Sequence, residues 1–321
     1  MHRCAILDDY QNVALAMADW SVLGPEVEIA VFNRHIEDRG ALVEALRDFD
    51  IIVAMRERTP FDAALLAALP RLRLLVTTGM RNASIDVAAA EKNGVIVCGT
   101  EGVAGSTAEL AWALILALVR NIPAEVEDFR RGAAWQSRLS GDLAGRHLGI
   151  VGLGRLGARV ARVGVAFGME VAAWSRSLTD ERASAEGATR APTLDALLST
   201  SDIVSVHVPL TPASRGLIGA RELARMKPTA FLVNTSRGPI VEESALIEAL
   251  SAGRLAGAAL DVFDREPLPA DHPLRRAERL IATPHIGYVT EATYRVFYGD
   301  AVADIVAWLK GKPVRRIAAD R

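Results

Sequence analysis

The sequence predicts an α/β protein with two doubly wound parallel sheets of the Rossmann type. Short apolar runs alternate with longer helical patterns, and this alternation is typical of a parallel sheet covered by helices on both faces. Two such series occur, separated by a long apolar helical segment over 106–120. With 321 residues, the chain is long enough for two domains.

The first series precedes the long helical segment. Helical patterns over 41–47 and 62–68 fall between its apolar runs, and Pro70 closes the second of them, since proline cannot continue a helix. The expected strands of this first sheet are the apolar runs 4–7, 27–31, 51–54, 74–77 and 95–98.

The second series begins at His147 and is followed by a last helical pattern over 290–310. We expect this last helix to return to the first domain and make it discontinuous. The predicted domains are therefore 1–102 plus 288–321, and 103–287. The expected strands of the second sheet are 148–151, 170–174, 203–207, 231–234, 257–260 and 280–282.

Composition and charge exclude several classes of function. The net charge of −2 gives no electrostatic reason to expect nucleic acid or an anionic membrane as partner. Cys4 and Cys98 lie in separate apolar runs, so we expect buried thiols rather than a disulfide or a metal site. The longest apolar run, 110–119, is too short to span a bilayer, and no signal peptide is evident at the N-terminus. We expect a cytoplasmic protein.

A glycine motif over 152–157, GLGRLG, follows the first strand of the second series and opens a helical pattern. This order of strand, glycine turn and helix is what a dinucleotide-binding loop requires, although the motif alone would also fit a turn without a ligand. Gly152 permits the tight turn, Gly154 lets a pyrophosphate approach the backbone, and Gly157 lets the helix pack close to the strand. The helix N-terminus offers free N–H groups to the phosphates. The expected cofactor residues here are Gly152, Gly154, Arg155, Leu156 and Gly157.

The strand that follows the glycine motif ends without a carboxylate. An NAD-binding protein often has Asp or Glu at this place, bonded to the adenine ribose. Here Ser175 and Arg176 follow Trp174. Arg176 suits the 2′-phosphate of NADP, but it also suits stacking on the adenine of NAD. We expect NADP(H) or NAD(H), with NADP(H) slightly favoured.

Three later segments each place one polar side chain beyond an apolar run. Arg237 follows the run 231–234, Glu266 follows 257–260, and His285 follows 280–282. Taken singly, such residues are usually surface or loop groups. In a parallel sheet, however, the carboxyl ends of the strands meet at one edge, where ligands bind. We therefore expect an arginine, a glutamate and a histidine to converge there.

These segments, together with the glycine motif and the segment 206–211 (VHVPLT), occur in an order that resembles the D-isomer-specific 2-hydroxyacid dehydrogenase family over nearly the whole chain. The resemblance implies hydride transfer between a nicotinamide cofactor and a small 2-oxo or 2-hydroxy acid of the glyoxylate or hydroxypyruvate kind. It implies D stereochemistry and a cofactor domain inserted into a discontinuous substrate domain, with the cleft between them. It also implies a homodimer built largely through the cofactor domains.

The side chains of Arg237, Glu266 and His285 are of the types that reduction of a 2-oxo acid requires. Arg237 can hold a carboxylate or carbonyl oxygen through its planar fork of donors. His285 is the expected general acid in reduction and general base in oxidation, and Glu266 its expected partner. By resemblance, Asp261 holds the nicotinamide carboxamide and Thr107 lies near the nicotinamide ribose. The remaining expected cofactor contacts are His207, where the backbone matters more than the ring, Pro209 and Thr235.

The first domain should supply the substrate loop. The loop after the run 74–77 contains Gly79, Met80 and Arg81, and it resembles the glycine-rich substrate loop of the family. Met80 and Arg81 replace the smaller residues usual there. Arg81 either binds a second anionic group of the substrate or pairs with Asp86 or Glu101. Arg56 follows another strand of this domain and is a further expected substrate contact.

The sequence is also compatible with two other functions. A phosphoglycerate dehydrogenase-type activity belongs to the same enzyme class, and we expect it less because no regulatory domain follows Arg321. A corepressor-like protein that senses NAD(H) belongs to another class. The set of Arg237, Glu266 and His285 favours an enzyme over a sensor, because a sensor has no need of it.

Overall fold

The computed structural model describes residues 1–319 and divides into two compact units. The first unit comprises Met1–Val103 and the chain from Thr290 onward, and the second comprises Ala104–Val289. The first unit is therefore discontinuous, and the second is inserted into it along the sequence. The predicted fold class, two parallel-sheet Rossmann-like domains, is confirmed.

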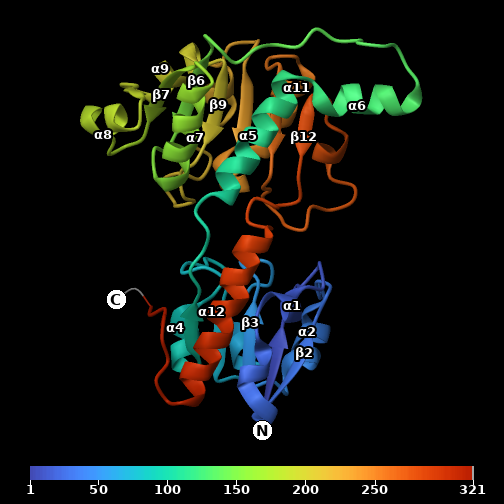
Figure 1. Ribbon diagram of the computed structural model, residues 1–321, viewed down its shortest axis with the longest axis vertical. Helices are drawn as coiled ribbons and strands as arrows, with labels where there is room; N and C mark the ends of the chain where they lie inside the picture. Colours follow the sequence, from blue (N-terminus) through green and yellow to red (C-terminus); the bar gives the residue numbers. More distant parts are fainter. Residues whose placement is uncertain (320–321) are drawn as a thin grey trace. The chain divides into compact units, whose positions relative to one another are not determined.

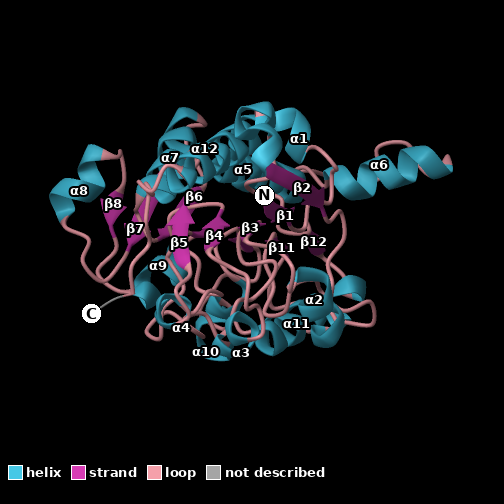
Figure 2. Cartoon of the chain, turned by 90° about the horizontal axis from the view of Figure 1, so that it is seen from below, coloured by secondary structure: helices cyan, strands magenta, loops and turns pink. Residues whose placement is uncertain are grey.

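The first unit holds a five-stranded, all-parallel sheet in the order β2-β1-β3-β4-β5. Helices lie on both sides of its strands, α1 and α12 on one side and α2, α3 and α4 on the other (Figure 2). The strands are β1 (His2–Ile6), β2 (Val27–Val31), β3 (Ile51–Ala54), β4 (Leu74–Thr77) and β5 (Ile96–Gly99). The helices are α1 (Ala14–Met17), the 3-10 helix η1 (Trp20–Glu26), α2 (Arg39–Leu46), α3 (Ala63–Ala67), α4 (Val87–Lys92) and α12 (Glu291–Leu309).

The last helix, α12, belongs to the first unit. It runs beside the strands of this unit although about 190 residues separate it from β5 (Figure 1). Its side chains Tyr298, Ala301 and Ile305 are completely buried. Asp304 is also completely buried, which is unusual for a carboxylate in an apolar core. The helix therefore supplies one side of the hydrophobic core, together with one buried carboxyl group.

The second unit holds a seven-stranded sheet in the order β12-β11-β10-β9-β6-β7-β8, again with parallel pairs throughout. The strands are β6 (His147–Val151), β7 (Glu170–Trp174), β8 (Thr189–Arg190), β9 (Ile203–Val206), β10 (Phe231–Asn234), β11 (Gly257–Leu260) and β12 (Leu280–Ala282). The helices are α5 (Ser106–Val119), α6 (Ile122–Arg131), α7 (Arg155–Ala166), α8 (Asp180–Ala185), α9 (Leu194–Thr200), α10 (Ala220–Leu223) and α11 (Glu243–Ser251), with 3-10 helices η2 (Gly238–Ile240) and η3 (Pro273–Arg276).

Side chains of the second sheet alternate between two hydrophobic cores. Leu148 and Ile150 of β6 pack with α5 and α7 on one face. Val151 of the same strand packs with α9, α10 and α11 on the other face. A strand with both faces buried reads as a continuous apolar run, which is why β6 was recognisable in the sequence.

Helix α6 was not expected from the sequence. It projects from the rest of its unit (Figure 1) and buries none of its described residues. Pro123 stands in its first turn and Gly132 ends it in the left-handed conformation, both favourable positions.

Among the described residues, no single helix is long and apolar enough to cross a membrane. In this part of the chain, α5 and α6 reach that length and composition when taken together, but they are bent by 61°.

Candidate active site

The polar segments of the second unit gather at the carboxyl edge of its sheet. Strand β6 leads to β7 on one side and β9 lies on its other side, so the strand order reverses between β6 and β9. A crevice forms where such loops diverge, and dinucleotides bind there in open parallel sheets. The glycine motif follows β6, and the loops after β9, β10, β11 and β12 carry the remaining expected site residues of this unit.

Each glycine of the motif has a distinct steric environment. Gly152 has φ +100°, and a Cβ there would lie 2.8 Å from the backbone nitrogen of Val208. A Cβ on Gly157 would lie 2.1 Å from the carbonyl oxygen of Gly152. Gly154 differs, because its Cβ would meet no heavy atom of the described chain within 4 Å. Two glycines are thus required by packing, and the third leaves open space beside the backbone.

The residues around this loop fit a dinucleotide. Arg155 and Leu156 form the first turn of α7, whose N–H groups and positive dipole end favour a phosphate. The hydroxyl of Thr235, after β10, is buried and has no hydrogen-bond partner among the described residues. A buried hydroxyl of this kind is normally satisfied, so a ligand atom is a reasonable partner. The open space at Gly154 and the unpaired Thr235 hydroxyl both agree with a bound cofactor.

Two further contacts border the glycine loop. Arg176, after β7, is exposed and donates from Nη2 to the carbonyl oxygen of Ala213 at 2.5 Å. His207 donates its backbone N–H to the carbonyl oxygen of Val151 at 2.7 Å. The ring of His207 lies with Nε2 2.8 Å from Ser205 Oγ, and burial lowers the pKa of His207 to about 4. This imidazole is therefore neutral near pH 7, which suits a structural role, and Pro209 beyond it is exposed.

His285 and Glu266 form a direct pair. His285 Nδ1 lies 2.5 Å from Glu266 Oε2, and Glu266 Oε1 accepts the backbone N–H of Phe263 at 2.9 Å. His285 itself has φ +53°, an uncommon conformation for a residue with a side chain. The edge of the His285 ring also meets the ring of Tyr288 at 5.3 Å between centroids. The carboxylate fixes the ring through Nδ1 and leaves Nε2 without a hydrogen bond to any described residue.

A glycine brings the Arg237 loop against the loop that carries Glu266. A Cβ on Gly238 would lie 2.0 Å from the backbone carbon of Phe263, so only glycine allows this approach. Arg237 is half-buried and donates from Nη1 to the carbonyl oxygen of Ser236 at 2.7 Å. Asn234 Nδ2 bonds to the Arg237 carbonyl oxygen at 3.0 Å. The absence of a side chain at Gly238 therefore allows the segments that carry Arg237 and Glu266 to come together, as expected.

Asp261 holds the loop on which His285 stands. Its side chain is buried and accepts hydrogen bonds from Thr283 Oγ1 at 2.6 Å, from Ile286 N at 2.8 Å and from Gly287 N at 2.9 Å. Burial raises the pKa of Asp261, although these three donors oppose that shift. This clamp on both sides of His285 was not apparent in the sequence, and a contact of Asp261 with the nicotinamide carboxamide stays a prediction.

Thr107, at the start of α5, meets the same loop from another element. Its hydroxyl donates to the carbonyl oxygen of Gly287 at 3.1 Å. A Cβ on Gly287 would lie 3.2 Å from Thr107 Oγ1 and 3.0 Å from Asp261 Oδ2. Thr107 and Asp261 therefore lie close together around Gly287.

In the first unit, the expected substrate loop is held by side-chain hydrogen bonds. Gly79 has φ +93° and donates its N–H to Thr100 Oγ1 at 2.8 Å. Arg56, with φ +50°, donates from Nη1 to the carbonyl oxygen of Thr78 at 3.1 Å. Asn82 Nδ2 bonds to the carbonyl oxygen of Arg56 at 2.7 Å and also to a threonine hydroxyl. Arg56 and Gly79 are thus neighbours, as their places after β3 and β4 require.

Asn82 was not assigned a role from the sequence. Its Oδ1 accepts the N–H of Ser84 at 2.9 Å, a turn that asparagine forms readily. An asparagine two residues before a serine, directly after a glycine-containing loop, is a signal for such a turn.

Met80 and Arg81 are both exposed. Within residues 1–319, Arg81 makes no ion pair with Asp86 or Glu101. Asp86 instead caps α4 by accepting the N–H of Ala89, and the Glu101 N–H donates to Asp300. The alternative in which Arg81 pairs with one of these carboxylates is not observed among the described residues.

Comparison with known proteins gives a consistent picture. The model for the NAD-binding domain of the D-isomer specific 2-hydroxyacid dehydrogenases matches residues 112–287. The chain is 42% identical over 261 residues to a glyoxylate reductase of Aeropyrum pernix, covering 78% of this chain and 77% of that protein. It is 37% identical over 305 residues to a glyoxylate reductase of Korarchaeum cryptofilum, covering 90% and 91%. A D-3-phosphoglycerate dehydrogenase of Methanocaldococcus jannaschii is 37% identical over 83% of this chain, but only 50% of that protein is covered.

Solved structures agree with these relatives. A phosphoglycerate oxidoreductase of Vibrio cholerae superimposes with a TM-score of 0.92 at 36% identity, covering 97% of this chain and 100% of that one. A D-lactate dehydrogenase of Aquifex aeolicus, complexed with NAD and lactic acid, gives 0.80 at 26% identity, covering 96% of each chain.

Proposed function

Because the chain belongs to the D-isomer specific 2-hydroxyacid dehydrogenase family, we propose that it reduces a small 2-oxo acid of the glyoxylate or hydroxypyruvate kind. The family is the one that the sequence motifs resembled, and the protein is an oxidoreductase that moves a hydride between a nicotinamide cofactor and such acids. The observation that carries the proposal is the His285–Glu266 pair beside the Arg237 loop. A protein that only senses the cofactor does not require such a pair.

The proposed chemistry divides between these side chains. His285 donates a proton from Nε2 to the carbonyl oxygen of the substrate, and the reverse transfer serves oxidation. Glu266 holds Nδ1 of the ring, so that Nε2 is the nitrogen directed to the reacting group. Arg237 binds the carboxylate or the carbonyl oxygen through its planar donors. The bound nicotinamide supplies the hydride.

The remaining substrate contacts are proposed in the first unit. Gly79 shapes the loop and gives its own N–H to Thr100, so the backbone N–H groups of Met80 and Arg81 are the proposed donors to an anion. Arg56 lies against the same loop. The exposed guanidinium of Arg81 suits a substrate with a second anionic group. Phosphoglycerate oxidation is therefore the second candidate, and relatives named D-3-phosphoglycerate dehydrogenase agree with it.

For the cofactor, we propose NADP(H) or NAD(H), with NADP(H) slightly favoured. Ser175 and Arg176 follow β7 where a carboxylate would select NAD, and Arg176 is exposed there. Gly152, Gly154, Arg155, Leu156 and Gly157 are the proposed pyrophosphate contacts, and Thr107, His207, Pro209, Thr235 and Asp261 the proposed contacts nearer the nicotinamide.

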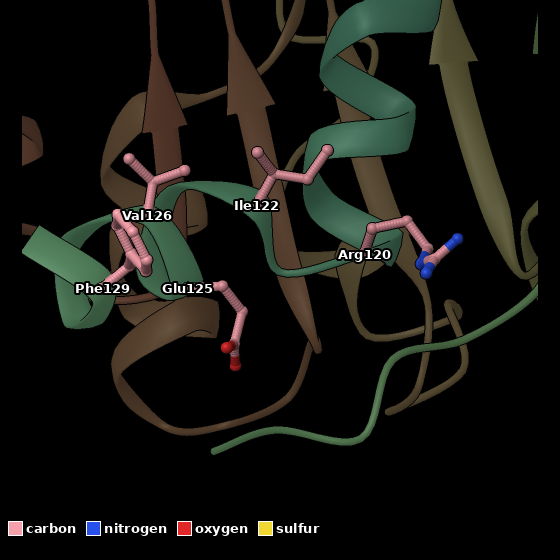
Figure 3. A pocket seen from close by; sticks show the side chains of 5 residues that line it. All are labelled: Arg120, Ile122, Glu125, Val126 and Phe129. Carbon is pink, nitrogen blue, oxygen red and sulfur yellow. The ribbon is translucent and has the colours of Figure 1, made fainter. Parts of the chain in front are cut away.

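We also propose a cytoplasmic homodimer joined through α6. Ile122, Val126 and Phe129 line an open pocket on this helix (Figure 3), and Phe129 is 72% exposed. Acidic residues lie in the middle of α6, and Arg130 and Arg131 end it. Two copies of the helix packed antiparallel would set opposite charges side by side and cover the apolar stripe. Phe129→Glu should give a monomer by sedimentation, whereas a dimer with wild-type affinity would reject this interface.

The test of the function is turnover of the purified protein. NADPH and NADH are supplied separately with glyoxylate, hydroxypyruvate, pyruvate and phenylpyruvate, and loss of absorbance is followed; 3-phosphoglycerate with each oxidised cofactor tests the second candidate. Turnover of a 2-oxo acid would support the proposal, and the ratio of rates gives the cofactor preference. Binding of cofactor without turnover on the whole panel would refute it and favour a sensor.

A further inference from the structure

The C-terminal segment 311–319 turns back after α12 and pairs with the edge of the first sheet. The N–H of Gly99 donates to the carbonyl oxygen of Arg315 at 3.0 Å, and the N–H of Ile317 donates to the carbonyl oxygen of Val97 at 2.9 Å. Cys98 and Arg316 form the antiparallel bridge between these two bonds. Since β5 is the last strand of the sheet, the segment covers an edge that would otherwise expose unpaired backbone groups.

Arg315 anchors the segment to α12. Its Nη2 lies 3.0 Å from Asp304 Oδ1 and donates to the carbonyl oxygen of Asp300 at 2.8 Å. Its Nη1 lies 3.5 Å from Asp300 Oδ1. The backbone of Arg315 has φ +47°, which is uncommon for a residue with a side chain. Because Asp304 is completely buried, loss of its cationic partner would leave a buried carboxylate uncompensated.

The same anchor reaches the substrate loop through β5. A Cβ on Gly99 would lie 3.0 Å from Ile317 Cδ1, 2.8 Å from the Gly79 carbonyl oxygen and 3.0 Å from Met80 Cα. The C-terminal segment and the substrate loop therefore both pack against Gly99. Because a packed interior transmits small displacements, a shift of Ile317 is expected to reach Gly79 and Met80 through Gly99.

A second connection runs through Asp300. Its Oδ2 accepts the N–H of Glu101 at 2.8 Å, in the turn that follows β5. The preceding residue, Thr100, accepts the N–H of Gly79 on its hydroxyl at 2.8 Å. Asp300 thus contacts both Arg315 and the turn that holds Gly79.

We propose that the C-terminal segment, fixed by Arg315 to Asp300 and Asp304, positions the substrate loop at Gly79–Arg81. Arg315 acts through the loop and has no contact with the reacting atoms in this scheme, so it is a positioning residue. The kinetic part of the inference rests on the proposed function, in which the loop binds the substrate carboxylate. The structural part, the coupling of segment and loop, does not.

The test compares Arg315→Met with Arg316→Met at pH 8. Arg316 is the next residue, is exposed, and forms no ion pair with a described residue, so it is a matched control. Arg315→Lys tests rescue by a shorter cation. Hydrogen exchange of the peptide over 79–82 reports on the loop without any turnover. KM for the 2-oxo acid, kcat and the cofactor Kd are then measured on the same samples.

We expect Arg315→Met to accelerate exchange over 79–82 and to raise KM about tenfold, because small displacements of substrate-positioning groups are costly. The cofactor Kd should stay unchanged, Arg315→Lys should recover part of the loss, and Arg316→Met should match the wild type. Unchanged exchange in folded Arg315→Met would overturn the proposal, and so would faster exchange spread evenly over the whole first unit.

A further variant covers the case in which Arg315→Met does not fold. Ile317→Ala keeps both aspartate contacts and removes only the side chain that meets Gly99, and it should accelerate exchange over 79–82 alone. Exchange equal to the wild type in that variant would also overturn the proposal. If the wild type turns over no 2-oxo acid, the proposed function fails separately, and the exchange data still decide whether segment and loop are coupled.

Discussion

Replacing Gly154 by alanine should separate cofactor binding from folding. Gly154 has φ −86°, a conformation that alanine adopts freely, and its Cβ would meet no heavy atom of the described chain within 4 Å. The free energy of unfolding should therefore stay the same or rise by at most about 1 kcal/mol. The added methyl group, however, occupies the space through which a pyrophosphate would approach the first turn of α7.

The size of the binding defect follows from the hydrogen bonds at that turn. A hydrogen bond to a charged group contributes about 1.5–3 kcal/mol, and each 1.4 kcal/mol is about tenfold in Kd. Loss of one such bond by displacement of the pyrophosphate should raise the Kd for NADH and for NADPH about 10- to 100-fold. Both cofactors should be affected equally, because they share the pyrophosphate.

Gly157→Ala is the matched variant in the same loop. Its Cβ would lie 2.1 Å from the Gly152 carbonyl oxygen, so the backbone has to move. Overpacking of this kind costs about 1–3 kcal/mol, which urea unfolding resolves. Cofactor titration and urea unfolding of both variants test the reasoning. Gly154→Ala with wild-type Kd would show that the pyrophosphate does not approach there, and equal destabilisation of the two variants would refute the steric argument.

Three further predictions concern single side chains. His285→Ala should abolish turnover and leave the cofactor Kd unchanged, whereas substitution of the half-buried His147 by alanine, at the start of β6, should affect neither; substantial residual activity in His285→Ala would exclude the proton-transfer role. Arg176→Ala should raise KM for NADPH far more than for NADH, and equal effects would mean that Arg176 does not contact the 2′-phosphate. Burial raises the pKa of Asp304 to about 7, against the opposing effect of Arg315, so the folded state holds this proton more tightly than the unfolded state. The resulting stability is fully present below about pH 4 and is lost as pH rises through about 7. Asp304→Asn should remove this dependence, which amounts to at most about 4 kcal/mol, and parallel curves of unfolding free energy against pH for both proteins would contradict it.

The two parallel sheets and the nature of the candidate site could be predicted from local patterns in the sequence. A strand covered on both faces is a continuous apolar run, whereas apolar residues in a helix recur every three to four positions. Strand β6 and helix α7 can therefore be recognised from neighbouring residues alone. Gly152 and Gly157 in the glycine motif predict that the backbone segments around them pack closely. The order of Arg237, Glu266 and His285 after successive strands predicts one sheet edge, because parallel strands all end on the same side.

Which side chains meet could not be predicted from the sequence, because it depends on tertiary packing. The three hydrogen bonds to Asp261 join residues more than twenty positions apart, and no local pattern encodes them. In the sequence, Gly238 is indistinguishable from any other loop glycine, and only the structure shows that the backbone of Phe263 packs against it. The pairing of Arg315 with Asp304 likewise depends on the return of the chain to β5. Periodicity is a property of neighbouring residues, whereas these contacts depend on how distant segments pack together.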